Sequence, residues 1–370
     1  MFSLEIQPYI LKFRFDAGTS RGILKEKKVW FLILRHSDFP GREGRGEAGI
    51  LPGLSPENPE TFASDLRKLA DFILPQMETQ PRKWQRLSAR WLENWHGAWL
   101  PSALFALETA WLDWVNGGKE LICDASFHAG LISVRINGLV WMNSRAEMEK
   151  QARQKQDAGF DTIKFKVGAL DWQEELDMLR QIREEMPEMN IRLDANGAWK
   201  PGEALKKLEH LAALNIESIE QPIAPGQTEA MARICMESPI PVALDEELIG
   251  RPFDHQKFSL LEAVNPPFIV LKPGLLGGLG QCHQWICMAE DQGCSWWITS
   301  MLESNIGLNA IAQFAAHYNP HLPQGLGTGQ LFENNVPSGL ILNGSWISWR
   351  NKITGENPGT VLDSNKDFLN

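Results

Sequence analysis

Short apolar runs that end in a charged residue recur at an almost constant interval through the second half of the chain. Five of these charged ends are Lys166, Asp194, Glu220, Asp245 and Lys272, which follow one another every 25 to 28 residues. Helical patterns fill most of the intervals, so the repeating unit is one strand and one helix. Alternation of strands and helices predicts a parallel sheet covered by helices.

Two architectures contain such a sheet, and the charged ends distinguish them. A doubly wound sheet gathers its polar ends at one switch point, whereas a (β/α)₈ barrel directs every strand end into one mouth. Ionisable groups at five successive strand ends favour the barrel. If residues 132–138, ISVRING, are the first strand, then residues 325–329, GLGTG, are a candidate end for the eighth. The glycine-rich run at 274–280 lacks the spacing of a phosphate-binding loop, so nucleotide binding is not expected.

The first third of the chain has a different pattern. Residues 1–60 contain short strand-like runs separated by glycine-rich turns, which predict an antiparallel meander. From about 61 to 118, apolar residues recur every three or four positions, as in amphipathic helices. The N-terminal region is therefore predicted to be α+β.

Composition narrows the classes of partner. The chain has 46 acidic and 36 basic residues, a formal charge of −10 and no tract rich in lysine or arginine. A nucleic-acid partner or an anionic membrane surface is therefore not expected. Glu5 and Gln7 stand where a secretory signal needs its apolar core, and no apolar run is long enough for a membrane span, so a cytoplasmic location is expected. Five scattered cysteines without a CxxC pair suit free thiols rather than a zinc site.

The charged strand ends form a coherent set for proton abstraction. Lys164 and Lys166 lie two residues apart in one strand, so both point to the same face. Asp194, Glu220 and Asp245 would repel one another at a single mouth unless a cation lies among them, and an all-oxygen set favours Mg²⁺. A lysine whose pKa is lowered by burial and by a second ammonium group can serve as a general base.

The metal and the lysines have complementary tasks. Mg²⁺ opposite Lys166 would hold a substrate carboxylate and stabilise the enediolate that forms when the α-proton leaves. Lys272 ends the sixth strand, across the barrel from the second, so it can approach the substrate from the opposite side. Each charged residue taken singly has an ordinary explanation as a solvated strand end or a salt bridge, and only the combination indicates a catalytic site.

These residues resemble the motifs of the enolase superfamily, in its muconate-lactonizing-enzyme-like subgroup. That superfamily is itself a standard example of a Lys or His base working with Mg²⁺. The resemblance implies an α/β fold, namely a modified (β/α)₇β TIM-like barrel at residues 126–330. It also implies an α+β capping domain at residues 1–125, completed by the C-terminal segment 331–370. The motif positions are Lys164-x-Lys166, Asp194-x-Asn196, Glu220-Gln221-Pro222, Asp245-Glu246 and Lys272-Pro273.

Longer stretches resemble the o-succinylbenzoate synthase family within that subgroup. They extend over most of the chain and include GTSRG (18–22), ALETAWLD (106–113), ITSMLESNIGLNAIAQ (298–313) and PQGLGTGQLF (323–332). The implied activity is a lyase reaction that depends on Mg²⁺, with Mn²⁺ as an alternative ion. The reaction is the syn-dehydration of 2-succinyl-6-hydroxy-2,4-cyclohexadiene-1-carboxylate to o-succinylbenzoate in menaquinone biosynthesis. The expected partner is this small-molecule carboxylate, and the sequence is also compatible with a homo-oligomer.

The resemblance implies a role for each lysine. Lys166 would remove the α-proton and, once protonated, help the hydroxide leave from the same face. Lys272 would act as a cation beside the enediolate or the ring. Lys164 would lower the pKa of Lys166 and contact the bound carboxylate. Because aromatisation drives the elimination, the site needs mainly to position the substrate and stabilise charge.

Three more polar residues lie beside this set. Asn196 and Arg192 share a face with Asp194, so both are candidates for supporting the metal ligands from beneath. For Arg192, an interior ion pair that holds strand ends together is an equal alternative. Glu246 points away from Asp245 if the strand continues, and it is expected to pair with a group of a neighbouring strand.

Two segments are candidates for substrate binding. The glycine-flanked loop at 18–22 is predicted to fold over the ligand and to bring Ser20 and Arg21 to it. Arg21 is a partner for the succinyl carboxylate, with a plain surface charge as the alternative. Ser300 and Glu303 follow the seventh strand, where they line the pocket unless they cap the next helix instead.

Two other functions remain open. A racemase or epimerase acting on an N-acylamino acid or a dipeptide would use the same residues, with Lys166 and Lys272 as acid and base on opposite faces of the α-carbon. A barrel without activity that serves as a binding or scaffold protein is the second alternative. Such a protein would have little reason to retain all six charged positions at the strand ends.

Overall fold

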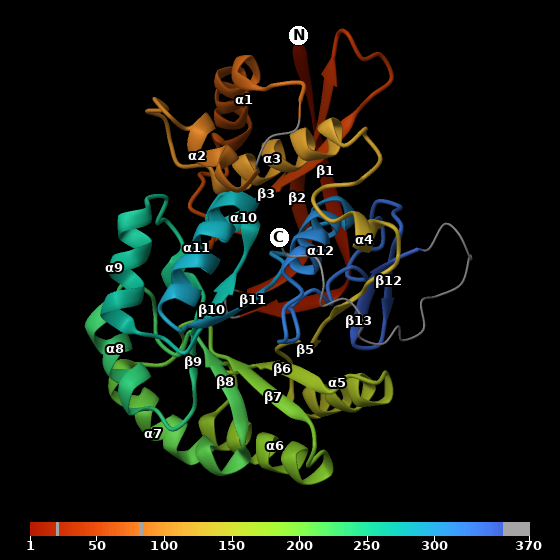
Figure 1. The fold of residues 1–370 in the computed structure, drawn as a ribbon. Coiled ribbons are helices and arrows are strands. Elements are labelled where there is room, and N and C mark those ends of the chain that lie inside the picture. Colours follow the sequence, from red (N-terminus) through yellow and green to blue (C-terminus); the bar gives the residue numbers. More distant parts are fainter. Residues whose placement is uncertain (20–21, 81–83, 351–370) are drawn as a thin grey trace, which may run out of the picture.

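The central element is a parallel sheet curled into a barrel. A computed structural model describes residues 1–19, 22–80 and 84–350 (Figure 1). Seven strands follow one another in the order β11-β10-β9-β8-β7-β6-β5, and all neighbouring pairs are parallel. The strands are β5 (Gly138–Val140), β6 (Thr162–Lys166), β7 (Asn190–Asp194), β8 (Ile216–Glu220), β9 (Val242–Leu244), β10 (Phe268–Leu271) and β11 (Ser295–Ile298).

A two-residue segment closes the gap between the first and last strands. Gln324 forms a parallel bridge with Ile136, just before β5, and Gly325 forms one with Thr299, just after β11. The Gly325 amide donates to the Ile298 carbonyl at 2.8 Å. The segment predicted to end an eighth strand therefore completes the barrel, and the predicted α/β fold class is confirmed.

The helices cover the outside of the barrel, as Figure 1 shows for α5 to α9. They are α5 (Arg145–Asp157), α6 (Trp172–Glu185), α7 (Pro201–Leu211), α8 (Thr228–Glu237), α9 (Asp254–Val264), the short α10 (Pro273–Leu276), α11 (Leu279–Asp291) and α12 (Asn305–Tyr318). Short 3₁₀ turns lie at Leu74–Gln76, Trp84–Arg86, Ala212–Leu214 and Glu246–Leu248.

Helix α6 shows how the sequence builds such an element. The Asp171 side chain caps the helix by accepting a hydrogen bond from the Gln173 amide at 2.9 Å. Leu176, Leu179 and Ile182 recur at helical spacing and are buried. The helix therefore begins at a capping residue and buries one apolar face.

The predicted first barrel strand, residues 132–138, overlaps the observed one only at its end, where Ile136 bridges Gln324 and Gly138 begins β5. Within this segment β4 (Val134–Arg135) pairs antiparallel with β13 (Trp346–Trp349), which pairs with β12 (Leu340–Asn343) in a separate sheet. The first barrel strand is β5. An alternating apolar pattern predicts an extended segment but does not identify its pairing partner, and this partner lies more than 200 residues away in the sequence.

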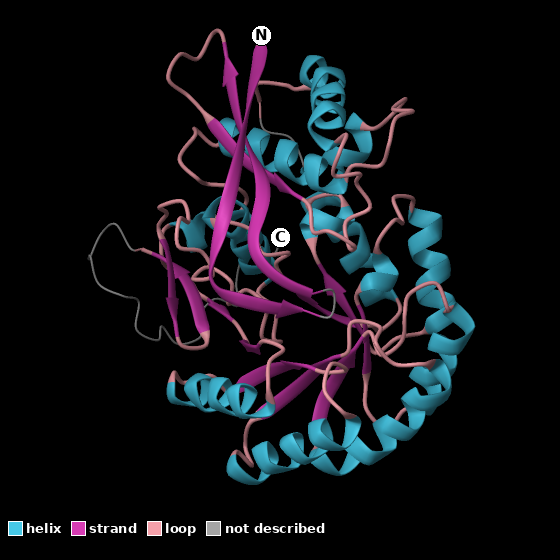
Figure 2. Cartoon of the chain, turned by 180° about the vertical axis from the view of Figure 1, so that it is seen from behind, coloured by secondary structure: helices cyan, strands magenta, loops and turns pink. Residues whose placement is uncertain are grey.

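The N-terminal region forms a cap of one antiparallel sheet and several helices. Its elements are β1 (Phe2–Thr19), β2 (Gly22–His36), β3 (Gly44–Gly49), α1 (Phe62–Ile73), α2 (Leu87–Trp91) and α3 (Pro101–Val115), followed by the short α4 (Ala125–His128). Figure 2 shows the long β1–β2 hairpin reaching from the cap down to the barrel. Helix α3 packs closely on β3, since a Cβ atom at Gly44 or Gly46 would lie about 2.0 Å or 1.9 Å from a helix carbonyl oxygen.

The chain returns to the cap after the barrel. The Arg14 amide donates to the Leu331 carbonyl and the Glu333 amide to the Lys12 carbonyl, each at 2.9 Å. The division into a cap at 1–125 plus 331–370 and a barrel at 126–330 stays a prediction, because β12 and β13 pair with β4 instead of with the cap sheet. All five cysteines are free. No helix in the described part of the chain has the length and apolar character to cross a bilayer.

The cap contains a buried acid, Glu57, and burial raises its pKa. The side chain is 4% exposed, and Oε1 accepts a hydrogen bond from the Ser102 amide at 2.7 Å, close to the start of α3. Burial raises the pKa of Glu57 from 4.5 to about 7, and the Ser102 bond opposes this shift. The folded state therefore binds the Glu57 proton more tightly than the unfolded state does.

We expect this acid to make folding less favourable as the pH rises. Its stabilising contribution is complete below pH 4.5 and is lost as the pH rises to about 7. In the wild type, this acid should lower the free energy of unfolding by about 3 kcal/mol as the pH rises from about 4 to about 8. Glu57→Gln should not show this decrease. Urea unfolding of both proteins across this range measures the difference. Parallel curves for the two proteins would contradict the expectation.

Candidate active site

The carboxyl ends of β6, β7 and β8 bring two lysines and two acids to one level of the barrel. In the register of the sheet, Lys166 lies beside Asp194 and Asp194 lies beside Glu220. Lys164 comes from the same strand as Lys166 and points to the same face. Asp245 follows β9 and Lys272 follows β10, so the remaining two groups join from the neighbouring strands.

These groups form a buried network of ion pairs. The Lys164 ammonium lies 2.8 Å from Asp194 Oδ2 and 2.5 Å from Glu220 Oε2. The Lys166 ammonium lies 2.5 Å from Asp194 Oδ2, and Lys272 pairs with Asp245 Oδ2. The structure thus brings all six predicted groups of the set together at the mouth.

Burial and mutual charge shift the acids in opposite directions. Burial raises the pKa of Glu220 to about 8, and the charge of Asp194 adds to this effect. Burial would also raise the pKa of Asp194, but the ammonium groups of Lys164 and Lys166 hold it well below its usual range. Burial would lower the pKa of Lys272, but the charges of Asp245, Glu220 and the other acids nearby together raise it. The same balance, with Asp194 and Glu220, raises the pKa of Lys164.

The carboxylates are a suitable donor set for a hard divalent cation. Across the residues that the structure describes, no three carboxylate, imidazole or thiol groups are arranged as metal ligands. Lysine ammonium groups lie at the oxygens of Asp194, Glu220 and Asp245. Glu220 Oε1, however, is buried and accepts no hydrogen bond from the described residues. All-oxygen ligation by carboxylates is what Mg²⁺ prefers. The residues therefore fit such a cation, which would compete with the ammonium groups for the same oxygens.

Asn196 connects Lys166 to Glu246. The Lys166 ammonium donates to Asn196 Oδ1 at 2.9 Å, and Asn196 Nδ2 donates to Glu246 Oε1 at 3.0 Å. The Asn196 amide donates to Asp194 Oδ1 at 2.9 Å, with the backbone in the left-handed region at φ 45°. Asn196 thus holds both the lysine and the acid beside it. Glu246 was expected to pair with a neighbouring strand, but it follows β9 and its partner Asn196 follows β7, two strands away in the sheet.

Arg192 lies deeper in the barrel. Among the described residues, no contact joins it to the carboxylates of Asp194, Glu220 or Asp245. Its guanidinium pairs with Glu217, donates to the Pro323 carbonyl at 2.7 Å and lies 4.3 Å from the centre of the Trp297 ring. These are the contacts of the interior ion pair that the sequence left open as the alternative. They connect β7 to β8, β11 and the segment that closes the barrel.

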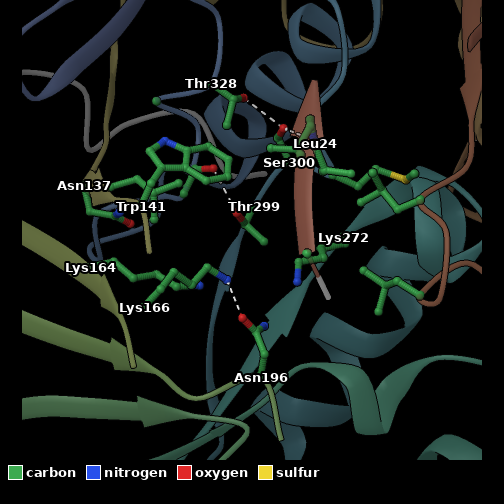
Figure 3. Close-up of a pocket in the computed structure, with 18 of the residues that line it drawn as sticks. Leu24, Asn137, Trp141, Lys164, Lys166, Asn196, Lys272, Thr299, Ser300 and Thr328 are labelled. Atoms are coloured by element: carbon green, nitrogen blue, oxygen red, sulfur yellow. Dashed lines mark hydrogen bonds between the residues drawn. The ribbon is translucent and has the colours of Figure 1, made fainter. Parts of the chain in front are cut away.

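A cavity of about 170 Å³ opens above the network (Figure 3). The ammonium groups of Lys166 and Lys272 enter it from opposite sides. The cap contributes apolar residues, and hydroxyl groups follow β11 and the closing segment. The lining includes Leu24, Leu51, Leu54, Leu139, Trp141, Lys164, Lys166, Asn196, Lys272, Thr299, Ser300 and Thr328. The cavity therefore has cationic groups on two opposite sides, and much of the remaining lining is apolar.

The predicted substrate-binding residues have different positions. Ser300 lines the cavity, and its Oγ accepts hydrogen bonds from Thr328 Oγ1 and from the Leu302 amide, both at 2.9 Å. Glu303 is 2% exposed and is not among the residues that line the cavity. Ser304, not Ser300, caps α12. Ser20 and Arg21 lie outside the described residues, so the structure places neither.

Sequence reasoning gave no role to Gln221, which is fully buried within the site. Its Oε1 accepts hydrogen bonds from the amides of Asp245 and Glu247 at 3.1 Å and 3.3 Å, and its backbone is in the left-handed region at φ 40°. Gln221 therefore connects the ends of β8 and β9. Its place directly after Glu220 was the available signal. The cavity residues Asn137 and Trp141 lie in a stretch, 136–142, that resembles the family, but nothing in the sequence marked either one as lining the pocket.

Comparison with known proteins agrees with this geometry. A family model described as enolase C-terminal domain-like matches residues 147–338. The chain is 40% identical over 357 residues to the o-succinylbenzoate synthase of Desulfotalea psychrophila, a match that covers 91% of this chain and 96% of that protein. It is 29% identical over 306 residues to the N-succinylamino acid racemase of Thermus thermophilus, with coverage of 82% and 79%.

A solved structure has the same architecture. The crystal structure of MenC from Desulfotalea psychrophila superposes with a TM-score of 0.80 at 35% sequence identity, covering 94% of this chain and 99% of that one. The fold, the grouped lysines and acids, and the extent of these matches lead to one assignment. The chain belongs to the enolase superfamily, and within it to the o-succinylbenzoate synthase family.

Proposed function

We propose that the protein is a Mg²⁺-dependent lyase that dehydrates 2-succinyl-6-hydroxy-2,4-cyclohexadiene-1-carboxylate to o-succinylbenzoate. The observation that carries the proposal is the cavity, where Lys166 and Lys272 face each other and are paired with Asp194 and Asp245. The 40% identity to an o-succinylbenzoate synthase over nearly the whole chain supports this choice among reactions that begin with loss of an α-proton.

Lys166 is assigned the proton transfer. Its ammonium group has two oxygen acceptors, Asp194 Oδ2 at 2.5 Å and Asn196 Oδ1 at 2.9 Å. They fix the position of the nitrogen at the cavity surface and stabilise the charge that the lysine gains when it takes the α-proton. The same proton then assists the departing hydroxide, so both steps take place on one face of the ring.

Lys272 and Lys164 are assigned to charge stabilisation. Lys272 is held protonated by Asp245 and enters the cavity opposite Lys166, so it can lie beside the enediolate or the ring. Lys164 bridges Asp194 and Glu220 and also lines the cavity, where it can contact the substrate carboxylate. Neither has to gain or lose a proton in this reaction.

The carboxylates are assigned to metal binding. Asp194, Glu220 and Asp245 would hold Mg²⁺, which when bound neutralises charge on the substrate carboxylate and makes the α-proton more acidic. Apolar side chains such as Leu24, Leu51 and Trp141 suit the carbon ring and exclude water. Ser300 offers a hydroxyl to the succinyl carboxylate, and Ser20 and Arg21 remain further candidates for binding that group. Glu303 does not line the cavity, so we no longer propose that it contacts the substrate.

One observation favours a second candidate function, racemisation of an N-succinylamino acid. Lys272 lies across the cavity from Lys166, which is where a second acid/base group would act on the other face of an α-carbon. The similarity to an N-succinylamino acid racemase covers 82% of this chain. The two functions need the same ion-pair network and differ in whether Lys272 transfers a proton.

Parallel assays separate the two functions. We expect purified protein with Mg²⁺ to consume the cyclohexadiene, followed by its absorbance, because the base and the charge-stabilising groups are all in place. An excess of chelator should stop this turnover. In ²H₂O, deuterium incorporation at the α-carbon of an N-succinylamino acid reports racemisation. Deuterium exchange without dehydration would replace the proposed lyase with the racemase. If the protein showed neither activity, a binding or scaffold protein would be favoured.

A further inference from the structure

A buried lysine of the cap is bonded to the wall of the cavity. Lys27 lies in β2 and is 3% exposed. Its ammonium group donates hydrogen bonds to the carbonyl of Met301 at 2.9 Å and to the carbonyl of Leu302 at 3.0 Å. These carbonyls belong to the segment after β11, on the barrel. One side chain therefore connects two parts of the chain that are about 275 residues apart in sequence.

The segment that Lys27 holds is part of the substrate cavity. Thr299, Ser300, Met301 and Leu302 all line it. The backbone of Leu302 has φ 65°, in the left-handed region that leucine rarely adopts. A non-glycine residue keeps such a conformation only where surrounding contacts enforce it. Two hydrogen bonds from one ammonium group to consecutive carbonyls are contacts of that kind.

Two acids oppose the effect of burial on the Lys27 ammonium group. Burial lowers the pKa of Lys27, and the charges of Glu303 and Glu47 oppose that shift. Glu47 also accepts hydrogen bonds from the amides of Ser304 at 2.9 Å and Gly307 at 3.0 Å, at the start of α12. The cap therefore holds the loop after β11 at both ends, with Lys27 at the cavity wall and Glu47 at the following helix.

We infer that Lys27 is a positioning residue of the substrate site, which fixes the cavity wall at residues 299–302 and so determines how tightly substrate binds. The inference deepens the proposed function and rests on it. Lys27 is not among the residues that line the cavity, and no contact with Lys166 or Lys272 is found among the described residues. Its effect therefore reaches the substrate through the position of Ser300 and its neighbours.

The test is steady-state kinetics of Lys27→Met, which keeps the length of the side chain and removes both donors. We expect KM for the cyclohexadiene to rise about tenfold, because hydrogen bonds from a charged donor are lost at the wall. We expect kcat to change by less than about threefold, because the groups assigned to chemistry are untouched. Lys27→Gln, which keeps a neutral donor, should give a smaller rise and covers the case in which Lys27→Met does not fold.

A second buried lysine provides the matched control. Lys257 in α9 is fully buried and donates to Gln281 at 2.6 Å and Gln284 at 2.7 Å, on the outside of the barrel. Lys257→Met should lower the melting temperature and leave KM unchanged. A Lys27 variant that behaves like this control, with lowered melting temperature and unaltered KM, would overturn the inference and leave Lys27 with a purely structural role.

A double-mutant cycle tests the connection to the strained residue. In a Leu302→Gly background the positive φ carries no steric cost, so Lys27→Met should raise KM by only about threefold there. If Lys27→Met raised KM equally in the wild-type and Leu302→Gly backgrounds, the proposed connection between Lys27 and the strained backbone of Leu302 would be overturned. Wild-type protein that does not consume the cyclohexadiene would contradict the proposed function instead, and the same cycle would then be read with the N-succinylamino acid as substrate.

Discussion

Lys166→Ala is expected to lower kcat for dehydration by about 10³-fold or more, because Lys164, the other lysine on the same side of the cavity, is bound to both Asp194 and Glu220 and is not placed to take the α-proton. Lys166 has the geometry for this task. Its nitrogen is held by Asp194 and Asn196, and its side chain is 14% exposed, at the cavity. The lysine on the opposite side, Lys272, is bound to Asp245 and approaches the other face of the substrate.

Single-turnover and steady-state assays of Lys166→Ala measure this loss, and circular dichroism checks that the barrel is intact. Lys166→Arg is the matched control for charge. An arginine keeps the positive charge beside Asp194 but cannot be deprotonated in a protein, so it should be as inactive as the alanine variant. Turnover near the wild-type rate in either folded variant would remove Lys166 from the role of base.

Glu220→Gln is expected to weaken Mg²⁺ binding by at least about 100-fold and to abolish turnover. Glu220 pairs with Lys164 through Oε2, and its Oε1 accepts no hydrogen bond from the described residues, so Oε1 is available to a cation. A neutral amide of the same shape removes the charge and leaves the packing of β8 unchanged. Titration calorimetry of the metal alone measures the affinity without any substrate.

Glu217→Gln is the matched control for this experiment. Glu217 lies on the same strand and pairs with Arg192 deeper in the barrel, so its replacement also breaks an interior ion pair. Removal of one partner from a buried pair costs about 3 to 5 kcal/mol of stability. We expect both variants to melt at lower temperature, whereas only Glu220→Gln should lose Mg²⁺. Equal Mg²⁺ affinity in Glu220→Gln and wild type would contradict the assignment of Glu220 as a ligand.

The grouping of the charged strand ends could be predicted because it follows from two regular features of a parallel sheet. Side chains alternate along each strand, and the carboxyl ends of parallel strands meet at one edge. Once Lys166, Asp194 and Glu220 were recognised as successive strand ends, their adjacency followed, and the register pairs them in that order. Lys164 and Lys272 joined the group by the same reasoning.

Other positions could not be predicted, because they depend on partners far away in the chain. The segment 132–138 has an apolar alternation that would suit either sheet, and only pairing with residues 346–347 assigns β4 to the smaller one. Arg192 shares a face with Asp194, but the ion pair with Glu217 and the ring of Trp297 hold it deeper in the barrel. Alternation gives the face of a side chain and not the direction in which a long side chain extends.

The sequence by itself determined the repeating strand and helix, the barrel that this repeat builds, and the acids and lysines at its mouth. These depend on local spacing, which the chain carries wherever it folds. The tertiary structure alone decided which oxygens each ammonium group occupies, that Gln221 connects two strand ends, and that Lys27 reaches the wall at Met301 and Leu302. Such contacts join residues distant in sequence, and only the pairing of the barrel strands and the packing of the cap against the barrel bring them within hydrogen-bonding distance.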